Sequence, residues 1–433
     1  MATTTARTTC RACGGAFEEV HDFGEQPVIS FGDREEIKAP LCLVKCSSCH
    51  LLQLRDTVDP EKLFRHYYYK SGVNMTMRNN LRGIVEEVQK RVSLSIVGEG
   101  VREDVVIDIG ANDGTLLSFY PEGLYRVAFE PSTLIEEAQK HSDMAVHGFF
   151  VAKDYLRIMG AEKKAKVITA IAMFYDLDDP NTFLQDIKKV LAPDGLFVVE
   201  MAYLPTMLSS LNIGNVCHEH LCYYSLRSLV LLLDKNGFTV GDIQFSDING
   251  GVFRVYAAHS KSPYLKDRFV TENKAIFDTL TAEGELHLET MQPYTDFIQR
   301  VFEQAAKLHE FIETELDLSE EVSGTPPVMT MNPRIDILGP STRGLMLLQI
   351  AGLTAKHFRF AVDRNPDKIG KTYHGIPVVS EETMRNKPPD YLLVLPTSFW
   401  PEMAKREMGV LKSGCKMILP MMPETLILGV EVL

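Results

Sequence analysis

The sequence predicts an α/β protein with a central Rossmann-like domain, a small cysteine-rich N-terminal domain and a Rossmann-like α/β domain at the C-terminus. Two apolar strands run into glycine turns, at Asp104–Gly110 and at Ile335–Gly339, and five of the eight cysteines lie before residue 50. The 433 residues also exceed the length of about 250 to 300 at which single cores stop growing. We expect domains at 1–70, 71–260 and 333–433, with a helical bridge and linker at 261–332.

Acidic side chains outnumber basic ones along the chain. Lys and Arg total 45, Asp and Glu total 58, and the formal net charge is -13. Such a charge repels a polyanionic duplex, so we expect no nucleic-acid partner. The first residues lack the apolar core of a signal peptide, and no apolar run approaches the ~18 residues that span a bilayer. These features predict a cytoplasmic protein with no membrane partner.

The N-terminal cysteines form two closely spaced pairs. Cys10 and Cys13 make one C-x2-C pair, and Cys46 and Cys49 make the second. Each pair can turn both sulfurs toward one ion, and four thiolates form the closed tetrahedral set that is typical of structural zinc. Two unrelated redox pairs are the alternative, but the thioredoxin-like strand and helix that they require are not visible in the sequence. The sequence therefore predicts a structural zinc site.

A tyrosine-rich segment, Tyr67–Gly72, leads into a helical pattern. Its apolar stripe consists of Met77, Leu81, Ile84, Val85, Val88 and Val92. We expect this helix to lie against the central domain. The preceding tyrosines either contribute a wall to a cofactor pocket or serve only in interface packing.

The first strand of the central domain ends in a turn that carries Asn112 and Asp113 between Gly110 and Gly114. This departs from the dinucleotide fingerprint, and its acidic surroundings suit a cationic, phosphate-free cofactor better than a pyrophosphate. The second strand ends in Glu130, whose carboxylate can accept both ribose hydroxyls. We predict an S-adenosylmethionine site; an NAD-dependent enzyme is the alternative. The predicted cofactor-binding residues are Tyr69, Ser71, Asp108, Gly110, Asn112, Asp113, Glu130, Pro131, Met173 and Phe174.

Several ionisable side chains gather between Cys217 and Tyr224. An imidazole with an ordinary pKa of about 6.5 can take up a proton at neutral pH, which favours acid/base chemistry. A catalytic metal bound by the His-Glu-His stretch is one alternative, and a buried structural network of histidines is another. The predicted catalytic residues are His220, Glu219, His218 and Tyr223.

In the C-terminal half, Ser341, Thr342 and Arg343 follow the second glycine turn at the start of a predicted helix. Backbone N–H groups and a guanidinium at such a position favour a diphosphate, although the turn could also be merely structural. Within residues 263 to 318, Pro293 divides two expected helices. The predicted substrate-binding residues are Tyr224, Asn249, Arg254, Ser341, Thr342, Arg343, Asp363, Arg364, Asn365 and Lys368.

Taken in order, these motifs resemble the nucleotide-sugar C-methyltransferases of branched deoxysugar pathways over nearly the whole chain. The resemblance rests on the cysteine pairs, Ile109–Gly114, Cys217–His220, Asn249–Tyr256, Gly339–Gly344 and Val362–Pro366. It implies a zinc-binding domain, an S-adenosylmethionine domain and a C-terminal domain that helps to hold a nucleotide-linked keto sugar. In the sugar C-3 methyltransferases the last histidine of Tyr-His-Glu-His is the proposed base, which implies that role for His220. Here Cys217 replaces that tyrosine, as in a related subgroup with Cys-His-Glu-His-Leu.

We therefore expect an S-adenosylmethionine-dependent C-methyltransferase. His220 would remove a proton next to a ketone, Glu219, His218 or Tyr223 would stabilise charge on the enolate oxygen, and the carbon would then accept the methyl group. One alternative is a methyltransferase of the same fold that acts on oxygen or nitrogen of another small acceptor. Another is a zinc-dependent binding module with a vestigial cofactor pocket. The sequence leaves open the sugar, the nucleotide, the acceptor carbon and the oligomeric state.

Overall fold

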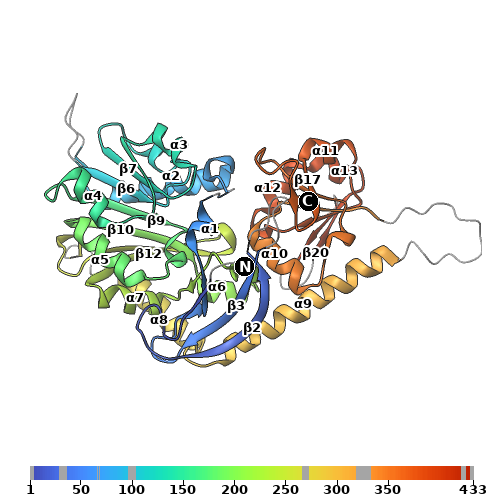
Figure 1. The fold of residues 1–433 in the computed structure, drawn as a ribbon, viewed down its shortest axis with the longest axis horizontal. Coiled ribbons are helices and arrows are strands. Elements are labelled where there is room, and N and C mark those ends of the chain that lie inside the picture. The colour runs from blue at the N-terminus through green and yellow to red at the C-terminus, as the bar shows by residue number, and fades with distance from the viewer. Residues whose placement is uncertain are drawn as a thin grey trace, which may run out of the picture.

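A computed structural model describes residues 4–28, 37–65, 67, 69–95, 104–265, 273–317, 333–420 and 426–429. Within these ranges the chain forms three main sheets, and Figure 1 shows the central and C-terminal sheets on either side of the N-terminal strands. The long helix α9 (Gln292–Asp317) runs along the base of the molecule from the N-terminal strands toward the C-terminal sheet (Figure 1). The predicted α/β fold class is confirmed.

The central sheet has seven strands in the order β12-β13-β10-β9-β6-β7-β8. The run from β10 to β8 is parallel, whereas β13 pairs antiparallel with both β10 and β12. Because the parallel strands end at one edge, the loops that follow β6, β7 and β9 meet there. The strands are β6 (Val105–Ile109), β7 (Tyr125–Glu130), β8 (Met144–His147), β9 (Ala165–Ile171), β10 (Leu191–Ala202), β12 (Phe238–Ser246) and β13 (Val252–His259).

The predicted apolar helix before the sheet is α2 (Met75–Arg91). Asn74 caps its first turn by accepting hydrogen bonds from the N–H groups of Thr76 and Met77. The predicted stripe is buried against one face of the sheet, where it shares a core with Val106 and Val198. Other helices around the sheet are α3 (Ile135–Ala138), α4 (Ala152–Met159), α5 (Pro180–Val190), α6 (Leu204–Ser209) and α7 (Leu226–Lys235).

Only a short 3₁₀ turn, Leu117–Phe119, follows the glycine turn after β6. Tyr120 already has an extended backbone, with φ -76° and ψ 144°. Pro121 explains the early end, because a proline disfavours the helical conformation in the residue before it.

The N-terminal sheet contains a strand from the central domain. Its order is β11-β4-β3-β2, and β11 (Cys222–Tyr223) pairs antiparallel with β4. The segment that follows His220 is therefore the edge of the cysteine-rich sheet. The N-terminal elements are β1 (Thr4–Ala6), β2 (Phe17–Pro27), β3 (Lys38–Cys46), β4 (Leu52–Leu54), β5 (Asp56–Val58) and α1 (Pro60–Phe64).

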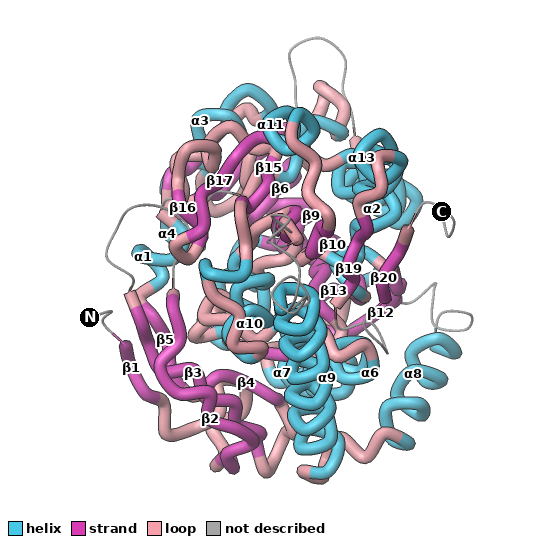
Figure 2. Tube along the Cα trace, turned by 90° about the vertical axis from the view of Figure 1, so that its right-hand side faces the viewer, coloured by secondary structure: helices cyan, strands magenta, loops and turns pink. Residues whose placement is uncertain are grey.

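Two helices form the bridge, α8 (Asn273–Glu285) and α9, and Pro293 lies in the first turn of α9, in agreement with the expected division. Figure 2 shows α9 in front of the central helices, with the strands β1 to β5 on one side of it and α8 on the other. The linker expected at 320–332 lies outside the described residues. The proposed domain boundaries stay predictions.

The C-terminal sheet repeats the parallel pattern, with the order β16-β17-β15-β14-β18-β19-β20 and antiparallel strands at both edges. Its strands are β14 (Ile335–Leu338), β15 (Phe360–Asp363), β16 (Thr372–Tyr373), β17 (Ile376–Ser380), β18 (Tyr391–Val394), β19 (Lys416–Leu419) and β20 (Leu426–Leu428). Its helices are α10 (Thr342–Ile350), α11 (Glu381–Asn386), α12 (Trp400–Arg406) and α13 (Met408–Lys412).

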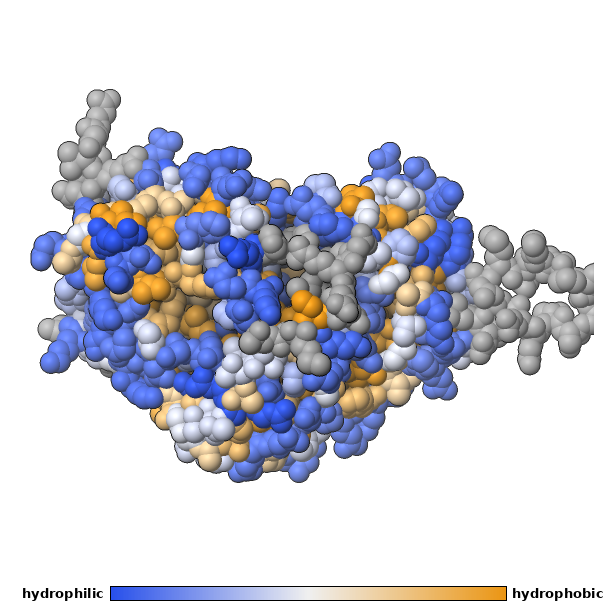
Figure 3. Space-filling view, in the orientation of Figure 1, coloured by the Kyte–Doolittle hydropathy of each residue, from blue (hydrophilic) through white to orange (hydrophobic). Residues whose placement is uncertain are grey.

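The face of the molecule in Figure 3 is mostly hydrophilic, and apolar residues interrupt it in small groups. Among the helices that the structure describes, none combines the length and the apolar character that a bilayer crossing requires.

Candidate active site

The four N-terminal thiols meet at one point. The Sγ atoms of Cys10, Cys13, Cys46 and Cys49 all lie within 4.8 Å of one another. The Sγ atoms of Cys10 and Cys49 are 3.6 Å apart, and those of Cys13 and Cys46 are 3.4 Å apart. A zinc tetrahedron with Zn–S bonds of about 2.3 Å has S–S edges of about 3.8 Å, so the four thiols fit one ion. All four positions are filled by protein, which makes this a structural zinc site.

The zinc site is fastened to the central domain. Arg11, which is 2% exposed, donates hydrogen bonds to Asp178 (Nε to Oδ1, 3.2 Å) and to the carbonyl of Leu54. Asn181 donates to the carbonyl of Arg11 at 2.8 Å, and Lys235 donates to the carbonyl of Ala12 at 2.7 Å. The loop after β9 and the cysteine-rich sheet therefore form one packed unit.

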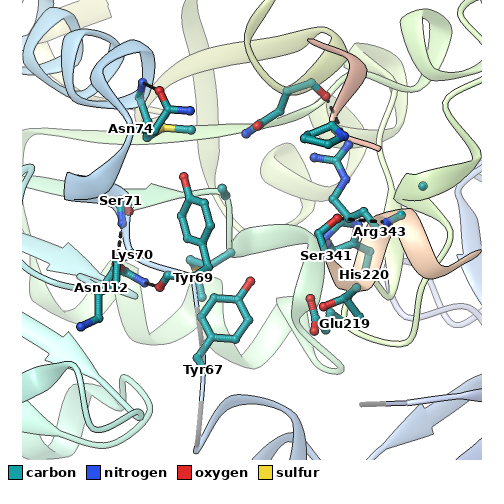
Figure 4. A pocket seen from close by; sticks show the side chains of 18 of the residues that line it. Tyr67, Tyr69, Lys70, Ser71, Asn74, Asn112, Glu219, His220, Ser341 and Arg343 are labelled. Atoms are coloured by element: carbon teal, nitrogen blue, oxygen red, sulfur yellow. Dashed lines mark hydrogen bonds between the residues drawn. The ribbon is translucent and has the colours of Figure 1, made fainter. Parts of the chain in front are cut away.

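A cavity of about 920 Å³ lies between the central and C-terminal sheets. Loops after β6, β7 and β9 line one side, and the turn after β14 lines the other. Figure 4 shows Ser71 and Asn112 across the cavity from Arg343 and the His220 segment, with the rings of Tyr67 and Tyr69 between the two sides. The volume is at the upper end for ligand pockets, so it can hold a cofactor together with a second molecule.

Carboxyl groups mark the strand ends on the central side. Asp108 accepts a hydrogen bond from Thr169 Oγ1 at 2.6 Å, and burial raises the pKa of Asp108 to about 7. Glu130 accepts from the backbone N–H groups of Asn112 at 2.8 Å and Ser132 at 2.9 Å, which fixes its carboxylate at the rim. Such a rim suits a cation and a ribose diol rather than a phosphate.

The backbone conformation of the turn after β6 requires a glycine at position 110. Gly110 has φ +71°, and a Cβ atom there would come within 3.1 Å of the Met173 side chain. Backbone of this kind strongly favours glycine. The backbone of the turn is therefore left open to the cavity.

A segment from before α2 covers the turn. Asn112 accepts from the Ser71 N–H at 2.9 Å and donates to the Tyr69 carbonyl at 3.0 Å, while Asp113 accepts from the Gly72 N–H at 2.7 Å. These bonds make Tyr69 and Ser71 a wall of the cavity. Asp113 itself points into this joint and toward Thr115 rather than into the cavity.

Most predicted cofactor residues line the cavity, namely Tyr69, Ser71, Asp108, Gly110, Asn112, Glu130, Pro131 and Met173. Phe174 does not. It is buried in an aromatic cluster with Phe183, Phe197 and Tyr224, with ring centroids 5.6 to 6.3 Å from its own.

His220 lies in the wall of the cavity, opposite the glycine turn. Its Nδ1 is 2.8 Å from the carbonyl oxygen of Asn215. Because a carbonyl can only accept, Nδ1 carries the proton and Nε2 keeps its lone pair. Burial, and then the charge of Arg343, lower the pKa of His220 to about 3. The ring is thus neutral at physiological pH and can act as a base through Nε2.

Glu219 lies beside His220 and is also buried. Burial raises the pKa of Glu219 to about 7, against the opposing effects of a hydrogen bond with Thr342 and the charge of Arg343. One ligand atom each from Cys217, Glu219 and His220 lies within 4.8 Å of the others, so this set also meets the spacing of a metal site.

Among the predicted catalytic and substrate-binding residues, four also lie outside the main cavity. His218 donates from Nε2 to the carbonyl of Ala39 at 3.0 Å, which ties the segment to β3. Tyr223 and Tyr224 are buried, and the Tyr223 hydroxyl has no hydrogen-bond partner among the described residues. Arg254 is buried in an ion pair with Glu200 at 2.7 Å. At these positions the four side chains can support the structure of the site, but they do not contact a ligand in the main cavity.

The C-terminal turn is built around the start of α10. Ser341 caps the helix by accepting from the Gly344 N–H at 3.1 Å, and Lys368 donates to Asp363 Oδ2 at 2.8 Å and to the Pro340 carbonyl at 3.0 Å. The predicted substrate residues that line the cavity are Asn249, Ser341, Thr342, Arg343, Asp363, Arg364, Asn365 and Lys368.

Arg343 reaches from the C-terminal domain into the central one. It donates to the side-chain oxygen of Asn215 and to the carbonyl of Asn249 at 3.2 Å. Asn215 thereby contacts Arg343 with its side chain and His220 with its carbonyl. Lys70 adds a second link, because its Nζ lies 3.0 Å from both Glu137 and Asp367.

Tyr67, Tyr175 and Asp176 also line the cavity, although they are not among the predicted site residues. Tyr67 belongs to the tyrosine-rich segment for which the sequence predicts either a wall of the cofactor pocket or interface packing. Tyr175 and Asp176 stand directly after β9, a position at which loops of parallel sheets meet ligands.

Three family models match successive parts of the chain. "Putative zinc binding domain" matches residues 10–64, "Methyltransferase domain" matches 78–242, and "C-methyltransferase C-terminal domain" matches 247–422. Over 434 aligned residues the chain is 29% identical to the C-methyltransferase NovU of Streptomyces niveus, with 98% of this chain and 97% of that protein covered.

Two solved structures are similar in part. Magnesium protoporphyrin IX methyltransferase from Synechocystis PCC 6803 is 14% identical, with a TM-score of 0.33 over 45% of this chain and 91% of that one. The 1,6-didemethyltoxoflavin-N1-methyltransferase from Burkholderia thailandensis is 16% identical, with a TM-score of 0.31 over 42% of this chain and 78% of that one.

The central sheet, its glycine turn and the matched domain define an S-adenosylmethionine-dependent methyltransferase. Zinc-binding, methyltransferase and C-terminal parts follow one another in the order of the family matches. Over nearly its whole length the chain is similar to C-methyltransferases.

Proposed function

We propose that the protein methylates a carbon of a nucleotide-linked keto sugar, in branched deoxysugar biosynthesis. The observation that carries this proposal is His220, a buried neutral imidazole that faces the glycine turn across one cavity. A carbon next to a ketone must lose its proton before it can accept a methyl group, and a neutral imidazole on the cavity wall can take up that proton.

Asp108, Gly110, Asn112 and Glu130 would hold S-adenosylmethionine, which supplies a methyl group on a positively charged sulfonium. The acidic side chain of Glu130 matches that charge and is placed to accept ribose hydroxyls. Tyr69 and Ser71, whose backbone groups form hydrogen bonds with Asn112, would cover the bound cofactor and exclude water from it.

The proton step belongs to His220. A ketone acidifies the neighbouring C–H bond, and Nε2 of the neutral ring can accept that proton. The Asn215 carbonyl, which accepts from Nδ1, fixes the ring and stabilises the imidazolium that results. Arg343, on the same wall, favours the negative charge that develops on the acceptor.

The C-terminal side of the cavity would hold the nucleotide part. The start of α10 presents backbone N–H groups, and Ser341, Thr342 and Arg343 stand there. A helix N-terminus with a guanidinium beside it favours a diphosphate. The two ends of the cavity therefore offer opposite charges to a cationic donor and an anionic acceptor.

A panel of nucleotide-linked keto sugars incubated with the protein and S-adenosylmethionine tests the proposal. We expect one methyl group per product, bonded to a carbon next to the ketone, as product NMR would show. Transfer to oxygen or nitrogen, or transfer only to acceptors without a ketone, would contradict it.

A further inference from the structure

The loop after β9 carries Tyr175 and Asp176 to the base. The Leu221 N–H donates to the Tyr175 carbonyl at 3.0 Å, and the Tyr175 ring meets the His220 ring edge-on with centroids 4.4 Å apart. The Asp176 N–H in turn donates to the Met173 carbonyl at 3.0 Å. These contacts fix Asp176 on the cavity wall next to the segment that holds His220.

Asp176 has an unsatisfied polar atom there. Its Oδ1 is buried and has no hydrogen-bond partner among the described residues. Glu219, by contrast, has the Thr342 hydroxyl and the charge of Arg343 beside it. A buried oxygen without a partner is costly, and the cost is smaller for the neutral acid than for the carboxylate. Asp176 as a whole is half-buried and lines the cavity, so a ligand there can contact it.

The surroundings of Asp176 favour the neutral acid. Burial, and then the negative charge of Glu219, raise the pKa of Asp176 well above its usual range. Two nearby arginines of the N-terminal segment, Arg7 and Arg11, pair with Asp178 instead. The other titratable groups that interact with Asp176 are Tyr67, Tyr175, Cys217 and Tyr223.

We propose that Asp176 is a catalytic residue that stays protonated and donates its carboxyl O–H to the ketone oxygen of the acceptor while His220 removes the neighbouring proton. A ketone oxygen can only accept, so a protonated carboxyl is its complement, and a carboxylate would repel the enolate. This inference rests on the proposed function, because it assumes a ketone in the acceptor.

The electron balance needs no further reactant. The C–H bond breaks, its proton moves to Nε2 of His220, and the electron pair passes into the C=C bond and onto the oxygen that Asp176 hydrogen-bonds. Attack of that carbon on the methyl group then forms the C–C bond and breaks the S–CH₃ bond, whose electron pair stays on sulfur. The ketone is restored, and His220 loses its proton to water.

Proton exchange tests Asp176 apart from methyl transfer. The protein is incubated in D₂O with S-adenosylhomocysteine and the keto sugar that the panel identifies, and loss of the acidic proton is followed by NMR. We expect Asp176→Ala to slow this exchange about 100-fold, the effect of removing one oxyanion donor. Asp176→Asn should recover part of the rate, because an amide N–H can also donate. Binding of S-adenosylmethionine should be unchanged in both variants.

The pH profile gives a second readout. Exchange by the native protein should fall at alkaline pH as Asp176 ionises, and Asp176→Asn should lack that fall. Asp179→Ala is the matched control, because Asp179 is an exposed carboxylate of the same loop that only caps α5. It should exchange at the native rate.

Native exchange rates in Asp176→Ala, or an unchanged alkaline fall in Asp176→Asn, would overturn the role of Asp176 and leave the proposed function standing. Equal slowing in Asp179→Ala would also overturn it, because the loop and not the carboxyl would then matter. If the native protein exchanges no proton of any keto sugar, both the proposed function and this inference fail.

Discussion

The two glycine turns of the molecule have the same local geometry and opposite charge. After β6, Gly110 lies near the acidic residues Asp108 and Glu130. After β14, Gly339 lies near Arg343, while Lys368 is paired with Asp363. Both glycines have positive φ, +71° and +76°. The comparison teaches that a strand, a turn and a helix create only an open backbone. The charge of the side chains beside it selects a cationic or an anionic ligand.

The turns also differ in how they are covered. The central turn is covered from its own side, by Tyr69 to Gly72 bound to Asn112 and Asp113. The C-terminal turn instead contacts the central domain, because Arg343 donates hydrogen bonds to Asn215 and Asn249 there. In the proposed function, the second turn is therefore placed to influence the base, and the first turn is placed to hold the methyl donor.

The largest effect should come from the base that lies between the two turns. His220→Asn removes the proton acceptor, so methyl transfer should fall about 1000-fold, within the range of lost acid/base catalysis. Affinity for S-adenosylmethionine, measured by calorimetry, should change less than threefold. His259→Asn, on the far β13, is the control. Native turnover in His220→Asn would contradict the assignment.

Loss of zinc should disturb the site through the shared sheet. Cys46→Ser removes one ligand, and because β11 pairs with β4, amide protection at 217–223 should fall together with that of the N-terminal strands. The expected loss of stability is on the order of 4 kcal/mol, as for other losses of a structural metal. Zinc content and hydrogen exchange measure it. Cys42→Ala, outside the thiol set, should keep its zinc; retained protection of 217–223 in a zinc-free variant would contradict the coupling.

Charge removal at each turn should affect one ligand only. Glu130→Gln should weaken the binding of S-adenosylmethionine about 10-fold, which corresponds to about 1.4 kcal/mol. The binding of the nucleotide sugar should change little. Arg343→Ala should do the reverse, because it lies on the anion side. Binding titrations of both ligands to both variants give the four values. Equal effects on both ligands would remove the division of charge between the turns.

The smallest effect concerns the protonation of His220. Because its pKa is lowered to about 3, the ring should stay neutral as the pH falls from 8 to 5, where an ordinary histidine gains its proton. The folded state thus binds fewer protons than the unfolded state, and this group's contribution to stability is complete above about pH 6.5 and is lost as the pH falls toward 3. Arg343→Ala should raise the pKa, since a nearby positive charge is removed. Imidazole NMR shifts measure both; titration near pH 6.5 in the native protein would contradict the prediction.

The zinc ligands, the strands with their glycine turns and the apolar stripe of α2 could be read from the sequence, because each depends on local spacing. Two C-x2-C pairs need only tight turns to converge, and the periodicity of α2 alone defines its buried face. The turn at Asn112 and the acid at Glu130 follow from their positions at strand ends.

Neighbouring residues of the segment from Cys217 to Tyr224 lie in different environments, which their spacing in the sequence could not distinguish. His218 and His220 are close in sequence, yet one binds β3 and the other faces the cavity. Phe174 packs in the core, whereas Asp176 lines the cavity. Arg254 forms an ion pair with Glu200 and does not line the cavity. The sequence by itself determines the residue types and the local hydrophobic periodicity. Which side chain reaches the cavity depends on how β11, the β9 loop and α10 pack against one another, and those contacts join segments far apart in the sequence.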